Sequence, residues 1–172
     1  MRPGSRSFAQ QRGFTYFGII IAVLLIGIAL AVVGTVTRTE VQREREVELL
    51  FVGHQYRAAI AHYALTNGGG HLPLNLTDLL VDERSVVPTH HLRRLYVDPM
   101  TGGTDWVLLR AADGGIYGIY SASKAVPRKR TGFGPTDIGF EDAACYRSWR
   151  FIYLPRRNLI PPAPDLLECS AD

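Results

Sequence analysis

A long run without a charged side chain lies near the N-terminus of this 172-residue chain. No charged residue occurs between Gly13 and Thr37, and the segment Phe14–Val36 reads FTYFGIIIAVLLIGIALAVVGTV. As a helix, this segment would extend roughly 34 Å at about 1.5 Å per residue, which matches a bilayer hydrocarbon core of roughly 30 Å. The sequence therefore predicts a single membrane-spanning helix over residues 14–36.

The charges on either side of this run predict its orientation. Arg2, Arg6 and Arg12 precede the run without any acid, and the first acid, Glu40, follows it. Positive charge before a span favours a cytoplasmic N-terminus and an exported C-terminal part. Two alternatives stay open: a plain signal anchor, and a signal peptide cut after Ala31 that would release a secreted soluble domain.

Helix-forming sequence continues beyond the apolar run. Residues 38–48 alternate in charge, as suits a solvated helix face. Apolar residues then recur every three or four positions, which predicts a stripe that covers a protein core. The stripe consists of Leu49, Val52, Tyr56, Ile60 and Tyr63. Because no proline occurs between Phe14 and the glycines Gly68–Gly70, we predict one helix over about residues 14–66, with residues 37–66 as its exported half.

The second half of the chain predicts a small sheet. Residues 105–110, 115–121 and 149–154 are rich in branched and aromatic side chains, and Ala112–Gly115 is a hairpin signal between the first two. The expected fold class is α+β, with the long N-terminal helix packed on a small antiparallel sheet. We expect the globular head at residues 67–154, followed by a proline-rich tail at residues 155–172.

The boundary before the apolar run carries a processing motif. Gln11-Arg12-Gly13-Phe14-Thr15, followed by an apolar helix, resembles the cleavage site of type IV pilin-like proteins. The resemblance implies that a prepilin peptidase cuts between Gly13 and Phe14, removes residues 1–13 as a cytoplasmic leader, and methylates Phe14. The family usually has a glutamate at the position of Gly18. Some minor subunits also lack it, so the resemblance implies a minor or accessory role.

Two later stretches add to this resemblance. His62–Leu80 is similar to the end of the pseudopilin spine, and Leu95–Gly103 is similar to an aspartate-proline turn of the major pseudopilin of type II secretion. The resemblance implies a structural subunit of a type II secretion pseudopilus or a related type IV pilus-like fibre, in the bacterial inner membrane with a periplasmic head. Its implied partners are other pseudopilins or pilins, the inner-membrane assembly platform and prepilin peptidase. The alternative is a single-pass anchored periplasmic binding or scaffold domain that does not polymerise.

Small residues recur at a spacing of four within the apolar run. Gly18 is paired in this way with Ala22, and Gly27 with Ala31. This spacing lets helices approach closely, so we interpret these positions as sites of lateral helix packing. The simpler explanation is that glycine and alanine are frequent in all such helices.

The resemblance also bears on Cys145 and Cys169. Pilin-like heads often close a C-terminal segment with one disulfide, which implies a bond between these two residues, worth about 3 kcal/mol in the chain-entropy model. Two free thiols are the alternative. The major pseudopilin holds calcium in the loop that corresponds to residues 121–139, but here Asp137 is the only acid in that loop. Because calcium takes several oxygen ligands, usually carboxylates, we expect no calcium site.

The sequence predicts neither an enzyme nor a cofactor. It lacks phosphate-loop, Gly-x-Ser-x-Gly and Cys-x-x-Cys motifs. His54 and His62 are eight residues apart on one expected helix, too far for a shared metal site. Arg128–Arg130 is a basic run without the interleaved aromatics that stack on bases, so we interpret it as a solvated loop and expect no nucleic-acid partner.

The net charge of +3, from 19 basic and 16 acidic residues, supports this interpretation. Arg2, Arg6 and Arg12 lie in the predicted leader, so its removal leaves 19 − 3 = 16 basic residues against 16 acidic ones. The positive surplus therefore indicates orientation rather than binding to nucleic acid.

Overall fold

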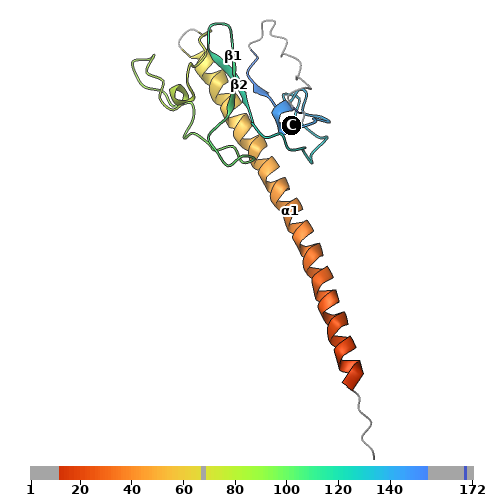
Figure 1. Ribbon diagram of the computed structural model, residues 1–172. Helices are drawn as coiled ribbons and strands as arrows, with labels where there is room; N and C mark the ends of the chain where they lie inside the picture. The colour runs from red at the N-terminus through yellow and green to blue at the C-terminus, as the bar shows by residue number, and fades with distance from the viewer. Residues whose placement is uncertain (1–11, 67–68, 155–168, 170–172) are drawn as a thin grey trace, which may run out of the picture. The chain divides into compact units, whose positions relative to one another are not determined.

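The computed structural model describes residues 12–66, 69–154 and 169 (Figure 1). Its elements in chain order are α1 (Arg12–Leu65), the 3-10 helix η1 (Leu76–Leu79), β1 (Val107–Arg110), β2 (Ile116–Tyr120), the 3-10 helix η2 (Tyr146–Ser148) and β3 (Phe151–Ile152). The chain divides into two compact units, Met1–Val41 and Gln42–Asp172. Helix α1 contributes residues to both, and we call the second unit the head unit.

The structure corrects the predicted membrane span. Within the described ranges, no helix is long and apolar enough to cross a membrane. A hydrocarbon core of roughly 30 Å takes about 20 consecutive apolar residues of helix, and no helix among the described residues supplies them. The membrane-spanning half at residues 14–36 is therefore wrong, and so is the fold class built on it. The single-pass location in the inner membrane, with a periplasmic head, is wrong for the same reason.

A small antiparallel sheet forms in the head unit, with the strand order β1-β2-β3. Val107 pairs with Tyr120, while Ile119 of the central strand pairs with Leu108 on one side and Phe151 on the other. The three predicted strands are confirmed in position, and each is shorter than its predicted range. Branched and aromatic side chains therefore located the strands, although pairing determined where each one ends.

The hairpin between β1 and β2 closes as its glycines predict. The N–H of Ala111 donates to the carbonyl of Gly115 over 2.8 Å, and the N–H of Gly114 donates to the carbonyl of Ala111 over 2.9 Å. Gly114 has a φ of 84°, a conformation that glycine adopts without a Cβ clash. The turn therefore needs glycine at position 114.

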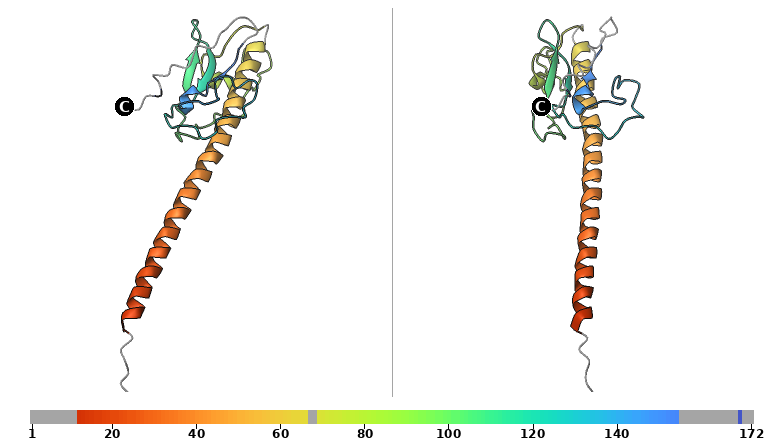
Figure 2. Two further views of the ribbon diagram at one scale, coloured as in Figure 1. Left: turned by 90° about the vertical axis from the view of Figure 1, so that its right-hand side faces the viewer. Right: turned by 45° about the vertical axis from the view of Figure 1, so that its right-hand side comes forward.

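Helix α1 covers the sheet with the predicted stripe, which is confirmed. Its five residues (Leu49, Val52, Tyr56, Ile60 and Tyr63) are between 0% and 8% exposed. They share one core with Ile116, Ile119, Trp149 and Phe151. The ring of Phe151 lies directly against Gly53, where any Cβ would overlap it. Figure 2 shows from two further directions that the strands run beside the last turns of α1.

A buried aspartate organises the turn before the sheet. The carboxylate of Asp98 accepts the N–H of Met100 at 2.9 Å and the hydroxyl of Ser121 at 2.6 Å. The carbonyl of Asp98 accepts the N–H of Gly102 at 2.7 Å. Because Ser121 directly follows β2, these bonds tie the aspartate-proline turn to the end of the central strand.

Candidate functional site

The predicted processing residues lie at the start of the described chain. Gly13 and Phe14 are in the first turn of α1. Residues 1–11 of the predicted leader, and all of the predicted tail except Cys169, fall outside the described residues. Cleavage between Gly13 and Phe14, and methylation of Phe14, stay predictions.

The described side chains of the first unit present an apolar surface. We call residues 16–29 of α1 the apolar segment. Its large apolar side chains are between 42% and 70% exposed; they are Tyr16, Phe17, Ile19, Ile20, Ile21, Val23, Leu24, Leu25, Ile26 and Ile28. Successive helical residues point about 100° apart, so these side chains surround the whole helix. Water disfavours such a surface, which makes the segment a site of contact with other apolar groups.

The four predicted packing positions divide between opposite faces of α1. Gly18 and Ala22 are one turn apart, and so are Gly27 and Ala31. Gly27 follows Gly18 by nine residues, which at about 100° per residue places it on the other side of the helix. A Cβ added at Gly18 or Gly27 would meet no atom within 4 Å. The helix can therefore be approached closely from two sides.

The structure joins Cys145 and Cys169 in a disulfide, with Cα atoms 5.7 Å apart and a sequence separation of 24 residues. Cys145 is buried beside η2. The chain has two cysteines, so no free thiol remains. The bond fixes residue 169 to the head unit.

A basic groove lies on the head unit, beside α1. We define it by Leu50, His54, Arg57, Ala58, Ala61, Lys129, Gly132, Phe133, Gly134, Thr136 and Asp137, which line a volume of about 590 Å³. Its floor is a cluster around Asp137, whose Oδ1 lies 2.8 Å from His54 Nε2 and 3.0 Å from Arg57 Nη1. Arg57 also donates to the carbonyl and the hydroxyl of Thr136, each over 2.7 Å. These contacts hold the loop at residues 129–137 against the helix.

The electrostatics of the groove depend on the contacts of Asp137. Burial acts to raise the pKa of Asp137, but hydrogen bonds and charges from His54 and Arg57 outweigh it and lower that pKa. The carboxylate therefore stays ionised and its charge is balanced locally. Lys129 adds a further cation, with its Nζ 4.9 Å from the ring centre of Phe133. The groove thus combines surplus positive charge with an aromatic ring and small apolar side chains.

The sequence does not indicate that these residues meet. Its patterns predict an ordinary surface or packing role for His54, an isolated acid at Asp137, and a solvated basic run that includes Lys129. A separation of more than 70 positions in the chain leaves no local signal. The available hint is that His54 and Arg57 are one helical turn apart, next to the buried stripe.

Glu46 also departs from the predicted solvated face at residues 38–48. It is buried, and its carboxylate accepts the hydroxyl of Tyr146 at 2.7 Å and the N–H of Arg128. Gln42 donates to the same hydroxyl over 2.9 Å. The position of Glu46 three residues before Leu49 extends the buried stripe by one turn. This carboxylate therefore links α1 to the loop that carries the groove.

The described residues contain no group of three or more histidine, cysteine, aspartate or glutamate side chains that could hold a metal ion. Asp137 is already engaged by His54 and Arg57, which does not suit a metal ligand. Both surfaces are therefore suited to binding other molecules. The apolar segment offers apolar contact, and the groove offers charged and apolar contact.

Comparison with known proteins adds no relative. No family model matches the chain, and neither a curated protein nor a solved structure matches it.

Proposed function

We propose that this chain is a structural subunit, of the minor or accessory kind, in a type II secretion pseudopilus or a related type IV pilus-like fibre. The subunit assembles by packing its apolar segment against the equivalent segments of neighbouring subunits. Its partners are other pseudopilins or pilins, the assembly platform and prepilin peptidase. The observation that carries the proposal is the apolar surface that surrounds residues 16–29.

The energetics of this surface favour association. Burying one Leu, Ile or Val side chain contributes about 1.5–3 kcal/mol, and the segment exposes several of each. The core of the head unit consists of residues outside the segment. Neighbouring subunits supply apolar cover for the exposed side chains of the segment.

The placement of small residues favours an extended array. Gly18 and Gly27 face opposite sides, so one helix can contact a neighbour on each side. A pair that used a single face would close on itself, whereas two opposite faces allow the contact to repeat. The motif around Gly13 and Phe14 supports the same function, because removal of the leader would leave an uncharged N-terminal run.

Cysteine cross-linking in the full chain tests the proposal. Because both native cysteines are bonded, Ile21→Cys introduces the only free thiol. Ala112→Cys, at an exposed position of the hairpin, is the matched control. Each variant is expressed together with a prepilin peptidase and a pilin-like fibre system and is treated with a short bis-maleimide. We expect Ile21→Cys to give cross-linked products with neighbouring subunits and Ala112→Cys to stay uncross-linked.

Mass analysis of the N-terminus in the same cells provides an independent readout. We expect a chain that begins at N-methylated Phe14. A chain that still begins at Met1, together with equal cross-linking of the two cysteine variants, would overturn the proposed function.

A further inference from the structure

We infer that two copies of this chain bind each other when a finger on one head unit enters the basic groove of the next. The finger consists of residues 83–88, between Asp82 and Thr89. This inference rests on the proposed function, since it adds a contact between head units to subunits that already associate through the apolar segment. The two contacts use different surfaces and can be tested separately.

The base of the finger is held firmly. Asp82 and Thr89 form an antiparallel bridge, with N–H to carbonyl distances of 2.8 and 3.1 Å. The buried carboxylate of Asp82 accepts two bonds from the Arg84 guanidinium, at 2.8 and 2.7 Å, and lies 3.1 Å from His91 Nε2. Arg84 also lies over the ring of Tyr63 at 3.6 Å and donates to the carbonyl of that residue. The loop therefore has one anchored conformation before any partner arrives.

The tip of the finger is apolar and exposed. Val86 is fully exposed and Val87 is 73% exposed, and the exposed Pro88 follows them. Two adjacent valines at an anchored tip can enter a partner without much loss of conformational freedom. This combination of a fixed base and an apolar tip indicates a surface for binding protein.

The groove complements the finger in chemical character and charge. It is concave, and Leu50, Ala58 and Phe133 contribute apolar surface to it. Lys129 adds positive charge, while the finger carries the exposed acid Glu83 beside its apolar tip. The volume of about 590 Å³ can accommodate several side chains. The finger of a second copy of this chain therefore supplies apolar side chains and an acidic side chain that can bind in the groove.

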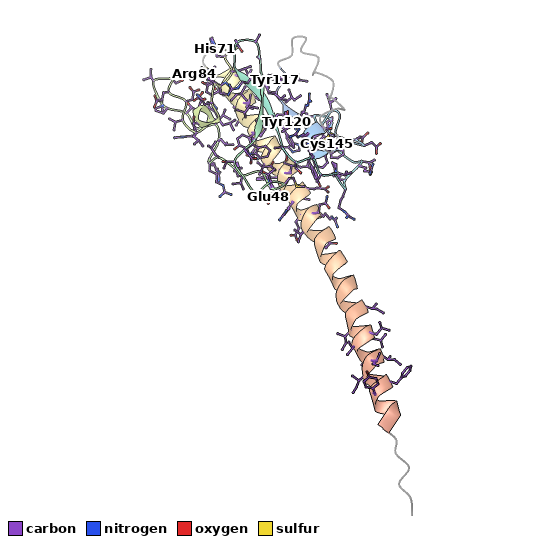
Figure 3. The ribbon with its side chains drawn as sticks, in the orientation of Figure 1. Glu48, His71, Arg84, Tyr117, Tyr120 and Cys145 are labelled. Atoms are coloured by element: carbon purple, nitrogen blue, oxygen red, sulfur yellow. A yellow bond between two sulfur atoms is a disulfide. The ribbon has the colours of Figure 1, made fainter. Side chains whose placement is uncertain are left out.

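The finger and the groove lie on opposite sides of α1. The finger is anchored at Tyr63 and the groove includes His54, nine residues earlier, which corresponds to about half a rotation of the helix. In Figure 3, Arg84 of the finger lies beside the C-terminal turns of α1. One head unit cannot fill its own groove, so the contact is between different surfaces of two copies and can repeat from copy to copy.

Paired cysteine variants of the full chain test this contact. One tagged copy carries Val87→Cys in the finger, and a differently tagged copy carries Ala58→Cys in the groove; both positions are exposed, so both variants should fold. Co-expression and treatment with a short bis-maleimide should give the mixed cross-link. The control pair combines Val87→Cys with Ala112→Cys and should give at most about a tenth of that yield, because the hairpin turn lies outside the groove.

Four substitutions sharpen the readout. Val86→Asp in the finger copy should lower the mixed cross-link by about tenfold, because it places a charge in the apolar contact, whereas Val126→Asp, an exposed valine outside both surfaces, should leave it unchanged. Lys129→Glu should lower the yield by about two- to fivefold, and Glu83→Lys in the finger copy should restore it.

The outcomes separate this inference from the proposed function. If Ile21→Cys cross-links while the finger and groove pair does not exceed its control, the contact between head units is overturned and the proposed function stands. If the pair cross-links but Ile21→Cys does not, assembly through the apolar segment is overturned and the contact stands. The finger contact would also be overturned if Val126→Asp lowered the mixed cross-link as much as Val86→Asp does.

Discussion

Two stretches of one helix, α1, use apolar side chains in opposite ways. In the apolar segment, residues 16–29, apolar groups surround the helix and are exposed. In the head unit, apolar groups of the same kinds form one stripe, and that stripe is buried under the sheet. A stripe specifies which face of a helix meets the core of its own chain. A complete apolar circumference specifies no single face.

The glycines of the two stretches also differ in how closely other atoms approach them. Gly53 in the head unit lies against the ring of Phe151, and any Cβ there would overlap that ring. Gly18 and Gly27 in the apolar segment have no atom within 4 Å of where a Cβ would be. Gly53 is therefore used for close packing within the head unit, whereas Gly18 and Gly27 are not used for close packing among the described residues.

We expect the largest effect on stability when two isoleucines of α1 are each replaced with alanine. Ile60 is 0% exposed and Ile26 is 59% exposed. Ile60→Ala should lower the free energy of unfolding of the head unit by about 2–5 kcal/mol, because it leaves a cavity in a closed core. Ile26→Ala should change it by less than about 0.5 kcal/mol. Urea unfolding followed by tryptophan fluorescence measures this, since Trp106 and Trp149 are both buried in the head unit.

The same two substitutions should affect assembly in the opposite order. Ile26→Ala should lower cross-linking through the apolar segment, whereas a version of Ile60→Ala that remains folded should not. If Ile26→Ala destabilises the head unit as much as Ile60→Ala does, the two stretches of α1 are not distinct in the way proposed.

The disulfide should have the next largest effect. Replacing both Cys145 and Cys169 with serine should lower the free energy of unfolding of the head unit by about 3 kcal/mol, because it opens a loop with a sequence separation of 24. The same unfolding assay, with and without a reductant, gives the measurement. The reductant should destabilise the native chain and leave the double variant unchanged, while equal stability of the two proteins would contradict a structural role for the bond.

A smaller effect should distinguish the glycines. Gly53→Ala should cost about 1–3 kcal/mol of head-unit stability, because the added methyl group must displace the ring of Phe151. Gly27→Ala is the matched helical control and should leave the unfolding curve of the head unit in place. If Gly53→Ala stabilised the head unit, as alanine stabilises an unconstrained helix, the close contact with Phe151 would be contradicted.

The sequence predicts those parts of the fold that have a local signal. The stripe from Leu49 to Tyr63 follows helical periodicity, and the three strands follow runs of branched and aromatic side chains, so residue patterns alone locate both. The membrane span is predicted from a hydropathy run, and the structure contradicts it. A run of apolar residues shows that a segment avoids water, and by itself it does not show what covers the segment.

The groove and the finger could not be predicted in the same way. Asp137 meets His54 and Arg57 across some eighty residues of chain, and no periodicity links them. Asp82 and Arg84 are neighbours in sequence, but their role depends on Tyr63 lying beneath them. Such clusters are formed by the tertiary fold, whereas local patterns specify only the helices and strands that carry them.

The smallest expected effect is a change of head-unit stability with pH, and it again distinguishes the head unit from the apolar segment. Hydrogen bonds from Arg84, and also from His91, lower the pKa of buried Asp82 well below its ordinary value of 3.8. Since the pKa of this group is lower in the folded state, the stability it contributes is present above about pH 4 and is lost as the pH falls toward the lowered pKa. Between pH 5 and pH 3, Asp82 should account for a loss of about 1 kcal/mol in the free energy of unfolding. Asp82→Asn should remove that dependence, and Glu83→Gln, an exposed neighbour, should retain it. The apolar segment carries no carboxylate, so association through it should not change between pH 5 and pH 3. Sedimentation of the assembled chain measures this, because a maleimide reacts with the thiolate, whose population falls with pH. A parallel loss of sedimentation and of head-unit stability with falling pH would show instead that assembly depends on the folded head unit.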